Sequence, residues 1–282
     1  MKLLRKIAQR SVDPLFYRIK FRRLVRRFRR FDEGTVVTDL DALGSVSRVT
    51  IVVAHPDDEV FCSGIICELK DRGAFVRILC LTRGEGGPTG SNTREKLGAI
   101  RETEMRASCS TLDVDELLFL GHVDPLAKEF RVFAPEVAVS ELAAQIHPFL
   151  NDSDLVISHG SSGEYWHPGH LLVFDATGAS LTFPEKEGPG WLTFLARNFD
   201  HPIQKLVNND DPAFLRIDVT AHSDRRERAI ESHRSQLGLF GRFAGGDYRG
   251  FIRKTGLESY ALRRIGKLQI AETADKSKGQ YD

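Results

Sequence analysis

The chain has 282 residues, which is long enough for one sizeable α/β domain with a hydrophobic core or for two small domains. Hydrophobic residues make up 41% and charged residues 28%, a balance that is ordinary for a soluble globular protein and does not indicate a disordered chain. No run of about eighteen apolar residues exists, which excludes a transmembrane helix, and the N-terminus lacks the apolar stretch of a signal peptide. We therefore expect a cytoplasmic protein. Its cysteines lack metal-type spacing and are expected to be buried reduced thiols: Cys62, Cys67, Cys80 and Cys109.

Residues 1–44 form a basic segment that differs in charge from the rest of the chain. Residues 1–31 carry twelve Lys and Arg against one Asp, so the remainder sums to about −10 although the whole chain has a net charge of +1. Apolar side chains recur at near-helical spacing from Leu15 to Phe31, which predicts a basic amphipathic helix beginning near Pro14. Such a helix binds an anionic membrane surface or an acidic partner, or packs on its own domain. We expect no nucleic acid as partner, because no nucleic-acid-binding motif accompanies it.

From residue 45 to residue 270, apolar runs alternate with helical patterns, as in one α/β domain. The expected strands are Val49–Ala54, Phe75–Thr82, Glu116–Leu120 and Asp154–Ser158, and the expected helices are Val60–Arg72, Arg94–Thr111, Pro135–Leu150 and Ala221–Gln236. This order predicts a Rossmann-like three-layer sandwich with a mostly parallel sheet. Residues 160–220 are less regular, and residues 271–282 form a polar tail. In such a sheet, ligands bind beyond the carboxyl ends of the strands.

An imidazole and two adjacent carboxylates follow the first expected strand, in the segment Ala54-His55-Pro56-Asp57-Asp58-Glu59. Histidine and carboxylate side chains are usual ligands of a catalytic zinc ion that keeps one position open for water. Two neighbouring carboxylates can divide the work, one holding the metal and the other acting as a base. In the alternative interpretation, Asp57 and Asp58 cap the next helix and His55 is an ordinary turn residue.

Two more histidines, His167 and His170, stand three residues apart after the fourth expected strand, at the start of a helix. If His170 reaches the metal, His167 is left facing the open side, where a substrate carbonyl would lie. Two histidines and one aspartate would then form a metal site suited to activating water. Ordinary surface or core histidines are the alternative, but two polar clusters at two strand ends favour a site.

The sequence resembles the LmbE/PIG-L family of zinc-dependent N-acetylglucosaminyl deacetylases. Residues 54–59 match that family's signature in full. The supporting matches occur in the family's order: Thr82–Glu85, Arg101–Glu104, Gly121–Asp124, His167–His170 and His233–Gln236. The resemblance covers residues 48–245.

The resemblance implies roles for five residues of the two clusters. His55, Asp58 and His170 would bind zinc, one ion per chain, and Asp57 would be the general base. His167 would stabilise the oxyanion of the tetrahedral intermediate or act as an acid. The implied reaction is hydrolysis of an acetamide by metal-activated water, which yields acetate and a free amino sugar.

Four more residues are implied to contact an N-acetylglucosamine-type substrate: Glu85, Arg101, Asp124 and Tyr165. The substrate would be a small-molecule, lipid-linked or polysaccharide-related conjugate, and residues 1–31 would suit peripheral contact with the inner face of a membrane. One departure concerns Gly169, where many bacterial members have an acidic residue that could orient His167. A metallohydrolase that cleaves another acylated amine and a non-catalytic saccharide-binding homologue remain the alternatives.

Overall fold

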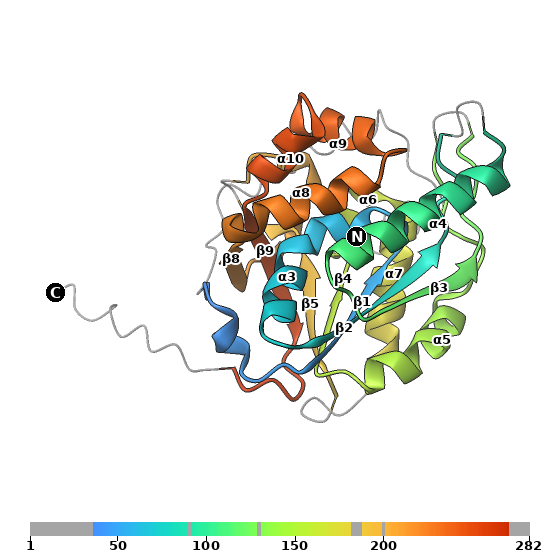
Figure 1. Ribbon diagram of the computed structural model, residues 1–282. Coiled ribbons are helices and arrows are strands. Elements are labelled where there is room, and N and C mark those ends of the chain that lie inside the picture. The colour runs from blue at the N-terminus through green and yellow to red at the C-terminus, as the bar shows by residue number, and fades with distance from the viewer. Residues whose placement is uncertain (1–35, 89–91, 129–130, 182–187, 199–200, 271–282) are drawn as a thin grey trace.

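Figure 1 shows the computed structural model of the chain. The structure describes residues 36–88, 92–128, 131–181, 188–198 and 201–270. The expected basic helix of residues 1–31 and the polar tail of residues 271–282 lie outside these described residues.

A seven-stranded sheet forms the centre of the domain, in the spatial order β3-β2-β1-β4-β5-β9-β8. Its strands are β1 Arg48–Val53, β2 Phe75–Thr82, β3 Glu116–His122, β4 Leu155–Ser158, β5 Gly190–Phe194, β8 Leu215–Asp218 and β9 Leu257–Arg264. Strands β1 to β5 run parallel, whereas β9 runs antiparallel to both β5 and β8. A second, two-stranded sheet pairs β6 Ala196–Arg197 with β7 Asn208–Pro212. The expected mostly parallel sheet is confirmed.

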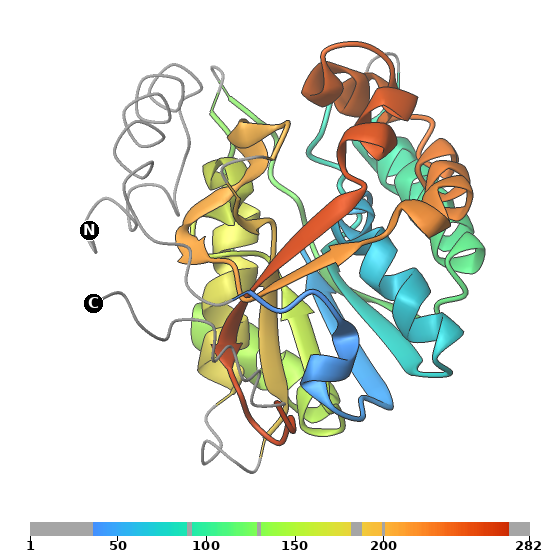
Figure 2. The same cartoon turned by 90° about the vertical axis from the view of Figure 1, so that its left-hand side faces the viewer.

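Helices cover both faces of the sheet and complete a three-layer sandwich (Figures 1 and 2). One face carries α3 Ser63–Asp71, α4 Arg94–Thr111, α8 Ser223–Ser232, α9 Leu237–Ala244 and α10 Tyr248–Lys254, and the other carries α5 Val139–Asn151 and α7 Pro168–Ser180. Two hydrophobic clusters lie between these layers. Ile51 belongs to the first and Val52 to the second, because successive side chains of β1 point to opposite faces.

The bounds of β2 and α4 agree with the prediction. The expected helix at residues 60–72 begins instead as a 3-10 turn, η2 Asp58–Cys62, before α3. The expected start of α5 at Pro135 is wrong: the N–H of Val137 donates to the Pro135 carbonyl, a bond that spans two residues and not four, and the helix begins at Val139. The stretch of residues 160–220 contains α7, β5 to β8, the short helix α6 Gly163–Trp166, and two 3-10 turns, η3 Gln204–Leu206 and η4 Thr220–His222.

Residues 36–43 pack against the domain, ahead of residue 45. Val37 forms a parallel bridge with Leu215 of β8. The 3-10 turn η1 Leu40–Leu43 buries Leu40 and Leu43 in the larger hydrophobic cluster. The packed structure therefore begins upstream of the start expected from the sequence pattern.

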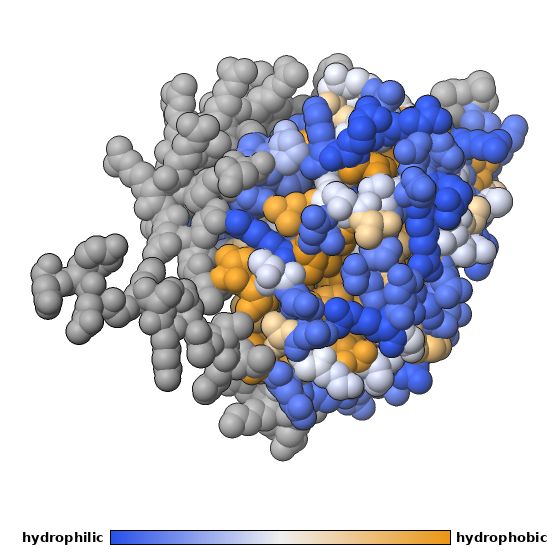
Figure 3. All heavy atoms as spheres, turned by 60° about the vertical axis from the view of Figure 1, so that its left-hand side comes forward, coloured by the Kyte–Doolittle hydropathy of each residue, from blue (hydrophilic) through white to orange (hydrophobic). Residues whose placement is uncertain are grey.

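All four cysteines are free and buried, as expected. None of the described helices combines the length and apolar character needed to cross a bilayer. Hydrophilic residues form much of the face in Figure 3, with hydrophobic groups between them. Large hydrophobic side chains in the described part are exposed at Val123, Leu126, Leu257 and Ile265.

Candidate active site

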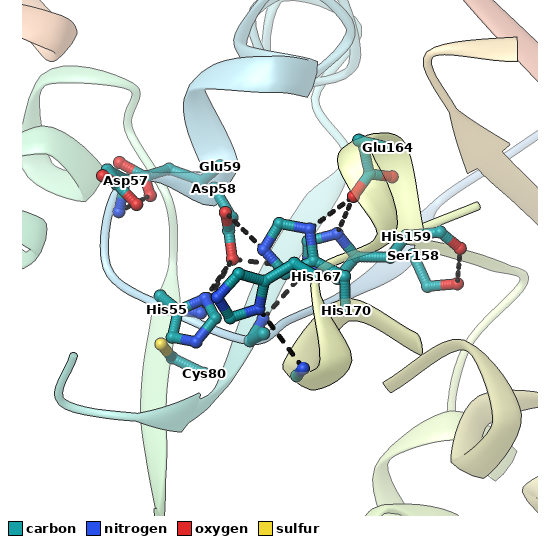
Figure 4. Close-up of polar contacts among 12 residues, drawn as sticks. His55, Asp57, Asp58, Glu59, Cys80, Ser158, His159, Glu164, His167 and His170 are labelled. Atoms are coloured by element: carbon teal, nitrogen blue, oxygen red, sulfur yellow. Dashed lines mark hydrogen bonds and ion pairs between the residues drawn. The ribbon is translucent and has the colours of Figure 1, made fainter. Parts of the chain in front are cut away.

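The site lies beyond β1 and β4, which are neighbours in the middle of the sheet. The chain leaves β1 towards α3 on one face and leaves β4 towards α7 on the other. This change of direction opens a crevice at the carboxyl ends of the two parallel strands. The two polar clusters follow these strands and therefore meet, as Figure 4 shows.

The backbone between the two aspartates turns their side chains in different directions. Asp58 lies among the histidines, whereas Asp57 lies apart from them (Figure 4). Asp57 has a positive φ of 106°, which is uncommon for a residue with a Cβ atom. Its N–H donates to Glu59 Oε2 at 3.0 Å, while Glu59 Oε1 accepts from Ser108 Oγ at 2.7 Å and pairs with His233. Glu59 thus holds the unusual turn that points the Asp57 and Asp58 side chains in different directions.

Asp57 is buried and forms an ion pair with Arg101. The Nη2 atom of Arg101 lies 3.2 Å from Asp57 Oδ1, and the same guanidinium donates to the carbonyl oxygens of Pro56 and Gly84. Burial raises the pKa of Asp57 to about 6, with Arg101 acting in the opposite direction. A carboxylate with a pKa near neutrality is suited to accept and return a proton.

Asp58 is the centre of a buried histidine cluster. Its carboxylate oxygens lie 3.3 Å from Nδ1 of His55, Nε2 of His159 and Nε2 of His170. Burial raises the pKa of Asp58, but His170 and His159 outweigh burial and hold that pKa well below its usual value. Two overlapping groups of described residues could hold a metal ion: Asp58 with His159 and His170, and His55 with His167 and His170. The three expected ligands are distributed over these two groups, which share His170.

Two imidazole nitrogens in this cluster have no hydrogen-bond partner. They are the buried Nε2 atoms of His55 and of His170. A buried polar nitrogen without a partner is energetically unfavourable, and a bound metal ion would satisfy both. Two histidines and one carboxylate form a donor set that catalytic zinc sites use. His55, Asp58 and His170 therefore fit a zinc ion by the chemistry of their atoms.

His167 lies beside the histidine cluster and lines the cavity into which the site opens. Its ring centre is 4.6 Å from the ring centres of both His55 and His170. His167 caps α7, because its Nδ1 accepts the N–H of Gly169 at 3.3 Å. Burial and the neighbouring His55 and His170 hold the pKa of His167 well below its usual value, so the ring is neutral and its Nε2 carries the proton.

Gly169 leaves room for the first histidine of the site. A Cβ atom at residue 169 would lie 3.1 Å from Cε1 and 3.2 Å from Nε2 of His55. These contacts are tighter than ordinary van der Waals distances, so a side chain at this position would require His55 to shift. The backbone N–H of Gly169 donates to His167 Nδ1 and so helps to orient that ring.

Three of the four residues expected to contact the sugar line the cavity beside the histidine cluster. Arg101, Asp124 and Tyr165 line the cavity, whereas Glu85 is not among the described residues that line it. Asp124 Oδ1 lies 3.6 Å from His55 Nε2, and its Oδ2 accepts the N–H of Gly86. The Tyr165 ring centre is 5.2 Å from that of His170. Arg101 thus contacts Asp57, and Asp124 lies beside His55.

Two buried residues of the site were missed by sequence reasoning: His159 and Glu164. His159 follows directly after β4, the position at which a ligand-binding side chain is expected in a parallel sheet. That position was the available signal for His159. Glu164 stands within the cluster around His167 and His170, but nothing in the local pattern indicates that it contacts both His159 and His170.

The candidate site opens into a cavity of about 430 Å³. Its polar wall contains His55, Asp57, Asp58, Arg101, Asp124, Tyr165, His167 and Gln236, and its apolar wall contains Leu126, Val132, Phe133 and Leu239. A cavity of this size with convergent polar groups on one side is typical of a small-molecule site.

Comparison with known proteins identifies the family. The family described as "PIG-L: GlcNAc-PI de-N-acetylase" matches residues 50–180. A Bacillus anthracis protein named "Probable N-acetyl-alpha-D-glucosaminyl L-malate deacetylase 2" is 30% identical over 196 residues, which cover 67% of this chain and 81% of that protein. The chain belongs to the PIG-L family. It is therefore a hydrolase of the N-deacetylase class.

Solved structures share the fold of this PIG-L family member. The N,N'-diacetylchitobiose deacetylase of Pyrococcus horikoshii superposes with a TM-score of 0.57 at 19% identity, covering 88% of this chain and 93% of that one. GalB, the 4-carboxy-2-hydroxymuconate hydratase of Pseudomonas putida, gives a TM-score of 0.53 at 18% identity, covering 77% and 96%. Because a hydratase has the same fold, the fold alone does not determine the reaction.

Proposed function

We propose that the protein is a zinc-dependent hydrolase that removes the acetyl group from an N-acetylated amino sugar. The observation that carries the proposal is a buried carboxylate, Asp57, that lines the same cavity as His55 and Asp58 but lies outside both metal-binding groups of the described residues. A base beside a metal site is the arrangement that activates water for amide hydrolysis. The family and the Bacillus anthracis relative support an N-acetylglucosamine-type substrate.

In this proposal Asp57 moves the proton and zinc supplies Lewis acidity. Zinc held by His55, Asp58 and His170 would polarise the acetamide carbonyl and increase the acidity of water. Asp57, held by Arg101, takes a proton from the attacking water. When the carbon–nitrogen bond breaks, the protonated Asp57 returns this proton to the departing amine. The water oxygen ends in acetate, and the sugar leaves with a free amine.

His167 serves as the hydrogen-bond donor to the reacting carbonyl in this proposal. Its Nδ1 is occupied by the Gly169 N–H, and the proton on its Nε2 is available to the cavity. A fixed donor aimed at a developing oxyanion stabilises the transition state more than the ground state. A neutral imidazole suits this role, because it keeps a donor at Nε2 over the physiological pH range.

A second cavity supports a substrate that extends beyond the sugar. It has a volume of about 730 Å³ and shares Pro125, Leu126 and Phe133 with the first. Its other apolar lining residues include Val137, Val139 and Leu172, and Arg94 and Lys128 contribute positive charge. We propose that an apolar part of the conjugate lies along this second cavity.

The Phe133→Ala variant tests this extended binding. We expect it to lower kcat/KM for an octyl N-acetylglucosaminide by about 10- to 100-fold, the equivalent of losing one buried aromatic side chain. The methyl glycoside serves as the control and should change much less, because its aglycone does not reach the second cavity. Equal losses on both glycosides would contradict binding of the aglycone there.

We also propose that residues 1–31 bring the enzyme to the cytoplasmic face of an anionic membrane. The support is the charge of this segment, twelve Lys and Arg against one Asp, since each cation near anionic lipid contributes about 1 kcal/mol. The full chain should co-sediment with phosphatidylserine vesicles at low salt, and a chain lacking residues 1–31 should not. Equal co-sedimentation of both chains would contradict this role.

Acetate release together with metal analysis tests the proposed function. The purified protein should contain about one zinc per chain and release acetate and amine in equal amounts from an N-acetylglucosamine conjugate. Zinc with release of a different acid would support hydrolysis of another acylated amine. Neither metal nor acetate would overturn the proposal and favour a non-catalytic saccharide-binding protein.

A further inference from the structure

A buried carboxylate, Glu164, contacts both His159 and the proposed metal ligand His170 (Figure 4). Glu164 Oε2 accepts from Nδ1 of His159 at 2.9 Å and from Nδ1 of His170 at 2.5 Å. The other oxygen, Oε1, also accepts two N–H groups, so this carboxylate acts only as an acceptor and both Nδ1 atoms carry the protons. One oxygen atom thus fixes the tautomer of two imidazoles.

The other oxygen of Glu164 is also held. Glu164 Oε1 accepts the N–H of Gly160 at 3.0 Å and the Nδ2 of Asn208 at 3.1 Å. The Oδ1 atom of Asn208 in turn accepts the backbone N–H groups of Ser162 and Glu164. Because Asn208 belongs to β7, the short helix α6 that carries Glu164 is fastened to the two-stranded sheet. The carboxylate therefore has little freedom to move.

The backbone around Glu164 adopts conformations that are rare for residues other than glycine. Glu164 has φ 57° and ψ −77°, and Trp166 has φ 66°. Such conformations are costly and persist where the surrounding contacts determine them, often at functional sites. The strain at Glu164 is consistent with a loop shaped to place its carboxylate.

The two imidazoles on Glu164 differ at their other nitrogen. Their rings stack with centres 3.9 Å apart, but the N–H of Ala54 donates to His159 Nε2 at 3.1 Å, whereas His170 Nε2 has no hydrogen-bond partner. A second ring proton on His159 would face the Ala54 N–H, so the Nε2 of His159 is used as an acceptor within the protein. The Nε2 of His170 accepts no hydrogen bond and lies 3.3 Å from the Asp58 carboxylate.

We infer that Glu164 is a positioning residue that orients His170 towards the metal, and that His159 supports this arrangement without being a ligand. The inference rests on the proposed metal site. The inference also decides between the two groups of residues that could hold a metal ion. The group that contains His159 would need the Nε2 atom of His159, which already accepts the N–H of Ala54. A carboxylate that accepts the far N–H of a ligand histidine fixes its orientation and increases its basicity.

The Glu164→Gln variant tests the positioning role through zinc affinity. A carboxamide cannot accept hydrogen bonds at both of its ends, so either the histidines or Gly160 and Asn208 would face an N–H group. We expect the zinc affinity, measured by competition with a chelator, to fall by about 10- to 100-fold. The matched control is Glu258→Gln, a buried carboxylate that accepts the N–H groups of Gly64 and Ile65. It should lower the melting temperature and leave the zinc affinity unchanged.

A matched pair of asparagine variants tests which histidine is the ligand. The Asn carboxamide nitrogen can take the place of Nδ1 and keep the bond to Glu164, but it provides no Nε2. His159→Asn should keep the zinc affinity within about 10-fold of wild type, whereas His170→Asn should lose more than about 100-fold, beyond the effect of an outer partner. Far-ultraviolet circular dichroism checks that the variants fold.

The outcomes separate this inference from the proposed function. A wild-type protein that binds no zinc would overturn the metal site and the inference together. Wild-type zinc binding with an unchanged affinity in Glu164→Gln would overturn the positioning role alone. A loss in His159→Asn as large as in His170→Asn would show that His159 is a ligand. If Glu164→Gln does not fold, the asparagine variants of His159 and His170 still decide which of the two histidines is the ligand.

Discussion

Replacing Asp57 with Asn should lower kcat for acetate release by about 10²- to 10⁴-fold, the usual contribution of a general base, while the bound zinc is retained. The carboxamide cannot take the proton from water, but its oxygen can keep the contact with Arg101. Asn also tolerates the positive φ of 106° at this position better than most residues. The loss should therefore come from the chemistry and not from a changed backbone. Steady-state kinetics and metal analysis on the same preparation measure both effects.

A control variant for this experiment is Asp154→Asn. Asp154 accepts hydrogen bonds from Ser47 and from the N–H of Arg48, at the end of β1 away from the site. This substitution removes the same charge and should leave kcat unchanged. Asp57→Asn with full activity would exclude Asp57 as the base and would move that role to another residue of the cavity.

Replacing the neighbouring Asp58 with Asn should remove the bound metal, whereas Asp57→Asn should retain it. Asp58 is the only carboxylate that lies 3.3 Å from Nδ1 of His55 and from Nε2 of His170 among the described residues. Loss of a residue that only hydrogen-bonds to a metal ligand lowers metal affinity by about 10- to 100-fold. Loss of the Asp58 charge should lower the zinc affinity by more than this. Acetate release should disappear with the metal. Chelator competition measures the affinity, and metal analysis after dialysis measures the content.

Added zinc distinguishes the two aspartates. Saturating zinc should restore part of the activity of Asp58→Asn, because the two histidines remain, but none of the activity of Asp57→Asn, which already holds zinc. The same loss of metal in both variants would contradict the division of roles between the adjacent carboxylates. Both experiments use a conjugate that the wild-type protein deacetylates.

The family signature was readable from the sequence because its chemistry is local. His55, Asp57 and Asp58 follow one strand within four positions, and His170 follows another, so their proximity could be predicted from the order of parallel strands alone. The start of α5 could not be predicted in this way, because a local hydrogen bond between Val137 and Pro135 replaces the first helical turn that was expected there. Apolar periodicity predicts that a helix exists better than it predicts where the helix begins.

The partners of the buried polar groups could not be predicted in the same way. Glu59 pairs with His233 and Glu164 with Asn208, and these residues are 174 and 44 positions apart in the sequence. Asp124, which lines the cavity, also lies 3.6 Å from His55, a contact that the sequence did not indicate. A carboxylate has the same local sequence signal whether it binds a ligand, a cation or a backbone amide.

The sequence by itself therefore determined the α/β class, the order of strands and helices as far as β4, and the gathering of histidines and aspartates at the ends of two parallel strands. These follow from hydrophobic periodicity and from side chains placed at strand ends, both of which depend on near neighbours in the chain. Only the tertiary structure decided that Arg101 pairs with Asp57 and that Ala54 occupies the Nε2 of His159. The physical reason is that a buried donor or acceptor must find a partner after the chain has packed, and packing brings together residues that are distant in sequence.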